Sequence, residues 1–364
     1  MLLSIESSKA MFLFVLFIAP ILLSISTVLE DKYIKISKIF LLLSFLMVFI
    51  PLGFRNCGID HGTYKSMYSN IDSNLKSYMF TPEPLFLILN LFASHIFGSF
   101  QIVYLVCGFL FTFGIYHFIL KHKDGNVFIN LFCILFSIYI YMCGLTRMSV
   151  AIGIISIAFN YIRDPKKYFA LVIIAFLWHY SACVAFLFYY AYNSKGNYKF
   201  RYNIFIIIVV FVVAKFLSSI GNSLPYVLAR YADYLSPSIN ISAIKNMIIL
   251  IPALIIFKVF NREYENELED YVQINNIINF IFVFIFISIM FTGLFRFTFY
   301  FYPLIGYIYA KFPVILIRAN GTIRLVYLYI ISFVVVGCIY LSYVFFNSPY
   351  ITRLIIPFEF NFYI

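Results

Sequence analysis

Four short polar stretches interrupt an otherwise apolar chain: FRNCGIDHGTYKSMY (54–68), CGLTR (143–147), AFLWHYS (175–181) and TGLFR (292–296). They contain Arg55, Asp60, Arg147, His179 and Arg296. Guanidinium groups bind two phosphate oxygens at once, and a neutral imidazole accepts a proton near neutral pH. These residue types therefore predict a site that binds phosphate and moves a proton.

Arg147 and Arg296 share the pattern Gly-Leu-x-Arg, and each directly precedes an apolar run. A cation at a helix N-terminus opposes the helix dipole, so neither arginine is suited to cap its own helix. An anion held jointly by the arginine and the first backbone N–H groups resolves this conflict. We therefore expect phosphate binding at these two residues and at Arg55 and Arg230. The alternative is that each arginine only extends to the membrane interface.

Three residues are candidates for proton transfer: His179, Asp60 and Glu83. His179 lies in an apolar context, where a histidine can act as a general base or can simply be a hydrogen-bonded core residue. Asp60 can act as an acid or base, or can cap a helix. Glu83 lies between two prolines, which predicts a rigid turn and makes it the weaker candidate.

Tyrosines accompany the charged residues in two places. Asp60, Tyr64 and Tyr68 are four residues apart, so a short helix would present them on one face. A second group in LPYVLARYADYLSP contains Tyr231, Asp233 and Tyr234. Aromatic rings stack on sugars while their polar tips hydrogen-bond hydroxyls, although tyrosines also form belts at membrane interfaces. No metal-ligand spacing is present, so we expect neither a metal nor a cofactor.

Composition defines the elements that must hold these residues. The chain has 364 residues, 63% hydrophobic and only 11% charged, with a mean hydropathy of +0.96. A soluble domain is nearer a quarter charged, so we expect one integral membrane domain over residues 1–364. The net charge of +11 is dispersed in short clusters, which does not favour nucleic-acid binding.

The basic clusters predict the topology, because positively charged loops remain in the cytoplasm. They lie at 32–38, 121–123, 163–167, 195–201, 258–262 and 311–324. If all are cytoplasmic, the chain is an all-α polytopic protein with about twelve transmembrane helices and both termini outside. The expected spans are 10–29, 39–53, 101–120, 127–143, 148–162, a pair within 167–192, 203–218, 242–260, 272–290, 297–312 and 325–346.

Two segments do not fit simple crossings. A crossing at 84–98 would invert every later loop, so we expect this segment to be re-entrant or interfacial. Residues 168–192 are too short for two full spans of roughly 20 residues each, so we expect two short helices that meet near His179. In this topology the polar residues gather in outer loops, which would form the site.

The polar stretches together resemble the EpsG-like branch of the Wzy polysaccharide polymerases. FRNCGIDHGTYKSMY resembles that family's Arg, Gly-x-Asp and Tyr-x-x-x-Tyr pattern, and EPLFLILNLF looks like its Glu-Pro-apolar segment. TRMSVAIGIISIAFNYI and AFLWHYSACVAFLFY are similar to its Arg-containing helix and its His-x-Ser-Ala segment. RYADYL and FRFTFYFYPL resemble its later elements, so the resemblance covers most of residues 40–312.

The resemblance implies a glycosyltransferase at the periplasmic face of the bacterial inner membrane. It would polymerise repeat units linked to undecaprenyl pyrophosphate, as in O-antigen and lipopolysaccharide biosynthesis. The growing chain would be transferred to the non-reducing end of a new unit. Besides this substrate and membrane lipid, a protein that regulates chain length is an expected partner.

Three other functions are compatible with such a chain. An O-antigen ligase would share the chemistry and differ in its acceptor. A flippase for lipid-linked oligosaccharides would be expected to show internal repeats and a polar route through the membrane, which the sequence lacks. A membrane O-acyltransferase could use a single histidine, but it would need polar residues on the side of its acyl donor.

Overall fold

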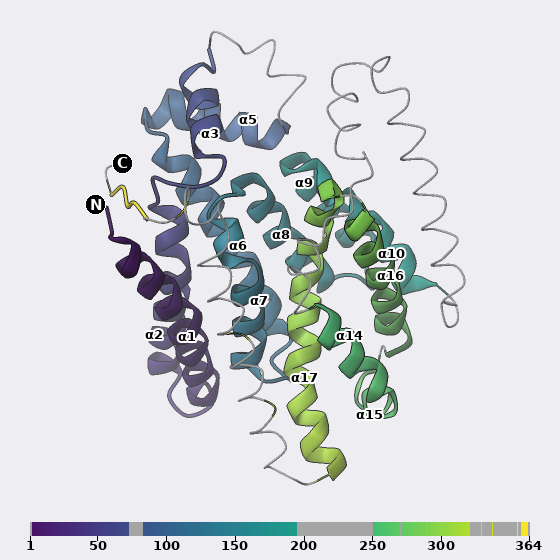
Figure 1. The fold of residues 1–364 in the computed structure, drawn as a ribbon. Helices are drawn as coiled ribbons and strands as arrows, with labels where there is room; N and C mark the ends of the chain where they lie inside the picture. The colour runs from purple at the N-terminus through teal and green to yellow at the C-terminus, as the bar shows by residue number, and fades with distance from the viewer. Residues whose placement is uncertain are drawn as a thin grey trace, which may run out of the picture. The chain divides into compact units, whose positions relative to one another are not determined.

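The computed structural model describes residues 2–72, 83–194, 250–269, 271–290 and 292–320, with single positions and a short segment between 329 and 362. Every element in these ranges is helical (Figure 1). The chain divides into two compact units, residues 1–180 with 306–364, and residues 181–305. The expected spans 203–218 and 325–346 fall outside the described residues, apart from single positions in the second.

Four helical runs in the described residues are long and apolar enough to cross a membrane. They are α1 (Ile5–Leu29), α2 (Ile34–Gly53), α6 (Gln101–Lys121) and the run Arg296–Arg318. Shorter apolar helices occur at Pro84–Phe97, Val127–Met142, Thr146–Phe159 and Tyr271–Ile285. The all-α class with several membrane-type helices is therefore confirmed, while the number of twelve crossings stays a prediction.

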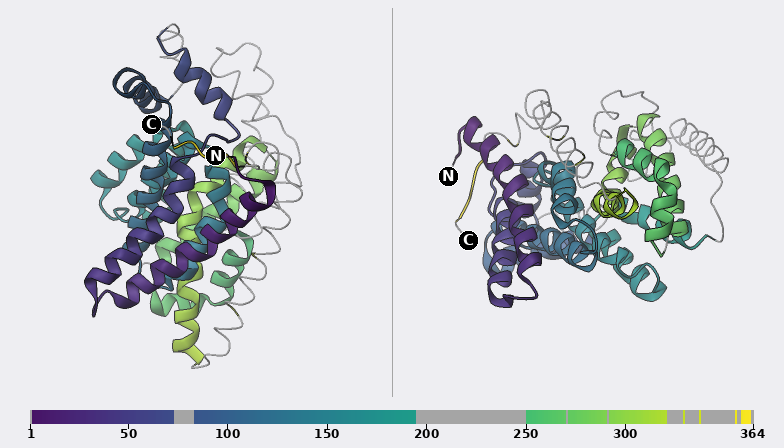
Figure 2. Two further views of the ribbon diagram at one scale, coloured as in Figure 1. Left: turned by 90° about the vertical axis from the view of Figure 1, so that its left-hand side faces the viewer. Right: turned by 90° about the horizontal axis from the view of Figure 1, so that it is seen from below.

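The first unit is built on helices that are apolar on nearly all sides. α1 packs on α2 and on α7 (Val127–Met142), and α6 packs between α2 and α8 (Thr146–Phe159) (Figures 1 and 2). A Cβ atom placed on Gly114 of α6 would lie 2.1 Å from the carbonyl oxygen of Gly153 on α8. Small residues allow two helix backbones to approach this closely, which is the usual way membrane helices pack.

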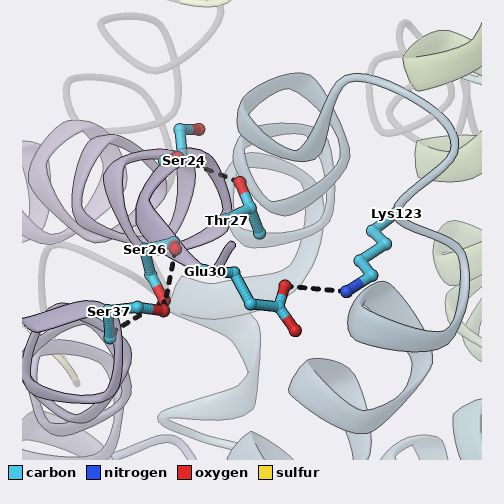
Figure 3. Close-up of polar contacts among 6 residues, drawn as sticks. All are labelled: Ser24, Ser26, Thr27, Glu30, Ser37 and Lys123. Atoms are coloured by element: carbon cyan, nitrogen blue, oxygen red, sulfur yellow. Dashed lines mark hydrogen bonds and ion pairs between the residues drawn. The ribbon is translucent and has the colours of Figure 1, made fainter. Parts of the chain in front are cut away.

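The helices of the first unit are linked by polar contacts at two ends. At one end, called the Lys123 end, Glu30 after α1 forms an ion pair with Lys123 after α6, and Ser26 and Ser37 exchange hydrogen bonds between α1 and α2 (Figure 3). At the other end, called the Arg55 end, the side chain of Gln101 donates a hydrogen bond to the carbonyl of Gly53.

The described residues between α2 and α6 form only short helices. α3 (His61–Ser69), α5 (Pro84–Phe92) and the π-helical turn Ala93–Phe97 (η1) are short. The contact between Gln101 and Gly53 holds both flanks of this segment at the Arg55 end. Residues 84–97 form two short helical pieces, and the re-entrant or interfacial placement of 84–98 stays a prediction.

The predicted break near His179 is also confirmed. α9 (Pro165–Trp178) ends directly before His179, which has extended backbone angles. A 3₁₀ turn at Tyr180–Cys183 (η2) follows, and α10 (Val184–Asn193) begins after it. His179 thus lies between two short helices, α9 and α10.

A short extended segment joins distant parts of the first unit. This segment is residues 358–361. Leu3 N donates a hydrogen bond to Phe358 O (2.9 Å), and Asn56 N donates one to Glu359 O (2.7 Å). Asn361 N donates to Phe54 O at 2.6 Å. Residues 2–3, 54–56 and 358–361 therefore lie at the same end of the unit, where Figure 1 shows the N and C labels side by side.

The second unit contains α10, α14 (Leu250–Val259), α15 (Asn261–Glu267), α16 (Tyr271–Met290) and a 3₁₀ stretch at Thr292–Phe301 (η4). α16 packs on α10 and on the 3₁₀ stretch. The hydroxyls of Ser181 and Tyr300 are hydrogen-bonded at 2.8 Å, so the start of this unit contacts the 3₁₀ stretch that also carries Arg296.

Candidate functional site

The turn before α8 positions Arg147. A Cβ atom on Gly58, whose φ is +143°, would lie 2.7 Å from the carbonyl oxygen of Cys143. A Cβ atom on Gly144 would lie 2.9 Å from the Ile59 side chain. Only glycine fits these two places without displacing a neighbour, so the loop that carries Asp60 packs directly against the turn that carries Arg147.

Glu83 joins two of the predicted site residues. Its Oε2 atom accepts a hydrogen bond from Nη1 of Arg147, and its Oε1 atom is 2.7 Å from Nδ1 of His179. The side chain of Glu83 is 5% exposed. The sequence predicted a rigid turn here, but Glu83 directly precedes α5 as its N-cap residue, with Pro84 in the first helical turn. α5 therefore fixes the carboxylate between α8 and the end of α9.

Glu83 is held in its charged form. Burial raises the pKa of its carboxyl group, but the hydrogen bond with His179 and the positive charges of Arg147 and His179 outweigh this, so the pKa lies below its usual value. An ionised carboxylate only accepts hydrogen bonds. Nδ1 of His179 must therefore carry a proton, and a neutral His179 keeps its lone pair on Nε2.

Arg147 lies between aromatic rings. Its guanidinium carbon is 5.4 Å from the ring centre of Tyr64 and 5.6 Å from that of Phe86. Among the described residues, nothing accepts a hydrogen bond from its buried Nε atom. The side chain is 20% exposed. Arg147 is thus held by Glu83 on one side and retains both donor capacity and access from outside.

α3 presents the acidic and aromatic residues as the spacing predicted. Asp60 is the N-cap residue of α3, yet its carboxylate accepts no hydrogen bond from the first backbone N–H groups. It accepts one from the hydroxyl of Tyr64 at 3.2 Å instead. Tyr64 is buried against Phe86, while Tyr68 is half-buried against Phe100. Of the two tyrosines on α3, Tyr68 has the more accessible ring.

Arg55 is enclosed beneath this cluster. It is 1% exposed, and it donates hydrogen bonds to Leu52 O (2.5 Å) and to Oγ1 of Thr146 (2.7 Å). Its guanidinium carbon lies 4.2 Å from the ring centre of Tyr104. This placement does not present Arg55 to a phosphate that arrives from outside the protein.

Sequence reasoning missed several residues that hold the cluster. Phe86 supports Arg147, Thr146 accepts a hydrogen bond from Arg55, and Tyr104 is hydrogen-bonded to Nδ1 of His61 at 2.8 Å. Thr146 directly precedes an arginine in the pattern CGLTR, and this was the available signal. Nothing in the local sequence distinguishes Phe86 or Tyr104 from the many other aromatic residues.

The remaining predicted site residues lie elsewhere. Arg230, Tyr231, Asp233 and Tyr234 are outside the described residues. Arg296 is exposed in the 3₁₀ stretch of the second unit. Within the described ranges, no three His, Cys, Asp or Glu side chains are grouped as metal ligands would be. The residues that the structure does bring together are Asp60, Tyr64, Glu83, Arg147 and His179.

The described residues form an all-helical protein with several helices of the membrane-spanning type. It contains a largely buried group of Arg147, Glu83 and His179. Residues 38–360 match the EpsG family, so the chain belongs to this family, which is associated with membrane proteins of exopolysaccharide biosynthesis. No curated protein and no solved structure matches the chain.

Proposed function

We propose that the chain is a glycosyltransferase that polymerises oligosaccharide repeat units carried on undecaprenyl pyrophosphate. The observation that carries the proposal is the Glu83 carboxylate, which holds Arg147 on one oxygen and His179 on the other. A phosphate-binding cation and a proton acceptor are thereby brought into one cluster, in a chain of the EpsG family. These are the two groups that this transfer requires.

In the proposed step, a sugar hydroxyl at the non-reducing end of a new lipid-linked unit attacks the anomeric carbon of the growing chain. The bond from that carbon to the pyrophosphate oxygen breaks, and undecaprenyl pyrophosphate leaves with the electron pair. The hydroxyl proton passes to Nε2 of His179, because Nδ1 is engaged by Glu83. Glu83 orients the imidazole through the hydrogen bond with Nδ1, as carboxylates do for catalytic histidines.

Arg147 stabilises the leaving pyrophosphate in this proposal. It lies at the start of α8, where the first backbone N–H groups also favour an anion. The residue before α8 is Leu145, whose side chain cannot cap those groups. Preorganised donors of this kind stabilise negative charge as it develops, so the transfer needs no metal.

The other predicted residues extend the proposed site. Arg296 and Arg230 are proposed to bind the pyrophosphate further, and Asp60 to adjust the hydrogen bonding of Tyr64 beside Arg147. Tyr68, Tyr231, Asp233 and Tyr234 are proposed to contact sugars. Each of these roles requires that its residue lies at the substrate when the lipid-linked units are bound.

The proposed orientation places the Arg55 end in the periplasm and the Lys123 end in the cytoplasm, in a twelve-span protein of the bacterial inner membrane. Basic residues beside the Lys123 end support it, because positively charged loops remain inside. Reporter fusions after residues 70 and 232 should report outside, and fusions after 165 and 265 inside. A cytoplasmic signal at residue 70 would contradict the proposed orientation.

The test of the function is deletion of the gene, followed by gel display of the surface polysaccharide. A polymerase deletion leaves glycan of one repeat unit and removes the ladder of longer chains, and the wild-type gene restores the ladder. Loss of all glycan from lipid A core would indicate a ligase instead. An unchanged ladder would rule out both functions.

A further inference from the structure

Arg55 is a buried cation whose hydrogen-bond partners are neutral. In the described residues, no carboxylate lies within ion-pair distance of its guanidinium. Its Nε atom is buried and has no acceptor among them. A buried charge without a counter-ion is costly, so this position needs an explanation other than stability.

The two hydrogen bonds of Arg55 connect the end of one helix with the start of another. Leu52 O belongs to the last turn of α2, and Oγ1 of Thr146 belongs to the first residue of α8. The next residue after Thr146 is Arg147. The planar fork of the guanidinium fixes the direction of both bonds, so it sets where α8 begins relative to α2.

The backbone around Arg55 is itself held in place. Arg55 is paired with Phe360 in an antiparallel bridge, and hydrogen bonds from Asn56 N to Glu359 O and from Asn361 N to Phe54 O flank it. Phe358 N also donates to Oγ of Ser8 at 2.8 Å. Segment 358–361 therefore fixes the backbone from which the Arg55 side chain reaches Thr146.

We propose that Arg55 is a positioning residue, which fixes the start of α8 so that Arg147 meets Glu83 and His179, and that segment 358–361 supports it. The catalytic role of the cluster of Arg147, Glu83 and His179 rests on the function proposed above. Arg55 itself contacts neither the sugar nor the pyrophosphate. This separates it from Arg147, which lies at the accessible side of the same cluster.

The first experiment measures turnover of purified protein with lipid-linked repeat units isolated from the deletion strain. Arg55→Lys keeps the charge but cannot make both bonds, and Thr146→Val removes the acceptor. We expect each to lower kcat about tenfold or more, because small misplacements of catalytic groups are costly, with KM nearly unchanged. Thr146→Ser restores the hydroxyl and most of the turnover. The double variant should be no slower than either single variant, because both changes break one contact.

A pH profile gives a readout that simple loss of stability would not move. The groups that face Glu83 are His179, Arg147, Tyr64 and Tyr180. If Arg147 is displaced, the Glu83 carboxyl loses a nearby positive charge and its pKa rises. The acid limb of the kcat profile should therefore move to higher pH in Arg55→Lys and Thr146→Val. It should return towards the wild-type position in Thr146→Ser.

The backbone support is tested at Asn361. Asn361→Pro removes the N–H group that bonds to Phe54 O, while Asn361→Ala keeps it. We expect the proline variant to lower kcat and to move the acid limb as Arg55→Lys does, and the alanine variant to behave as wild type. Equal behaviour of the two variants would overturn the role of segment 358–361.

Two outcomes distinguish this proposal from its alternatives. If Arg55→Lys weakens inhibition by inorganic pyrophosphate and Thr146→Val does not, Arg55 binds phosphate directly and the positioning role is refuted. Thermal unfolding in detergent of the same single and double variants measures the coupling between Arg55 and Thr146 without any substrate. Additive effects there overturn the positioning role even if the protein polymerises glycan. Coupling in a protein that polymerises nothing refutes the proposed function alone.

Discussion

At the Lys123 end of the first unit, Glu30 and Lys123 form an ion pair whose side chains are 41% and 49% exposed. At the Arg55 end, Glu83 and Arg147 are 5% and 20% exposed, and Glu83 also binds His179. Exposed pairs contribute about 0–1 kcal/mol, whereas removing one partner of a buried pair costs about 3–5 kcal/mol. The exposed pair at the Lys123 end therefore contributes little to stability, while the charges at the Arg55 end are buried at a cost in free energy.

The two ends also differ in whether their polar groups line a cavity or bond to one another. A cavity of about 490 Å³ lies beside the Lys123 end and is lined by residues that include Ser24, Glu30, Lys123 and Asn126. Its lining includes the hydroxyl, acidic and basic groups of Ser24, Thr27, Glu30 and Lys123, which Figure 3 shows. At the Arg55 end, the described charged groups instead bond to one another, since the Glu83 carboxylate accepts from Arg147 and pairs with His179. Enclosed, mutually bonded charges are the better sign of chemistry.

The largest effect is expected at His179. His179→Ala removes the proposed proton acceptor, and general-base catalysis typically contributes 10²- to 10⁴-fold. We therefore expect turnover of purified lipid-linked units to fall by about two to four orders of magnitude. His179→Gln, which keeps a donor towards Glu83 but cannot accept the proton in the same way, serves as the matched control. Near-normal turnover in His179→Ala would show that another residue is the base.

The next effect is expected at Arg147. Arg147→Ala should leave surface glycan as single repeat units at a normal protein level, since loss of one preorganised donor costs about 10²- to 10³-fold in rate. Arg147→Lys retains the charge without the fork and should recover only part of the activity. Gel display of the glycan and immunoblotting of the protein provide the measurement. Long chains in Arg147→Ala would contradict the proposed clamp.

A smaller effect is expected in how the stability of the fold depends on pH. The pKa of Glu83 lies below its usual value in the folded protein, so its ion pair stabilises the fold above the unfolded-state pKa. This stabilisation is lost as the pH falls through the folded-state value. Thermal unfolding in detergent between pH 7 and pH 3 should show this loss in the wild type and not in Glu83→Gln. Parallel curves for the two proteins would show that the pKa of Glu83 is the same in the folded and unfolded states.

The smallest effect is expected at the Lys123 end. Lys123→Ala should change the free energy of unfolding by less than about 0.5 kcal/mol and should leave the glycan ladder intact. The same thermal unfolding and gel experiments measure both quantities. A variant that loses the ladder here would remove the contrast between the two ends.

Much of the fold could be predicted from the sequence, because apolar length and basic clusters are strong signals in membrane proteins. They predicted α1, α2 and α6 and the break at His179. They did not predict the support between residues 54–56 and 358–361, because a pairing between distant extended segments leaves no local periodicity.

The site was predictable by residue type and less so by arrangement. His179, Arg147 and Glu83 were identified because ionisable residues are rare in apolar surroundings. That Glu83 joins the other two depends on the packing of α5, α8 and α9, which no local pattern encodes. Arg55 looked like Arg147 in the sequence, and only its burial distinguishes the two.

Segment 358–361 also has a consequence for how the protein is made. Ser8 and Phe358 are 350 positions apart in the chain, and at 5–20 residues per second their synthesis is separated by roughly 20 to 70 s. During that time the loop at Arg55 lacks its hydrogen-bond partners in residues 358–361. A ribosome that stalls, or a chain cut before residue 358, would thus yield an inserted helix bundle with an unfinished centre. Synthesis of residues 358–361 is thus required before the backbone at Arg55 gains its support.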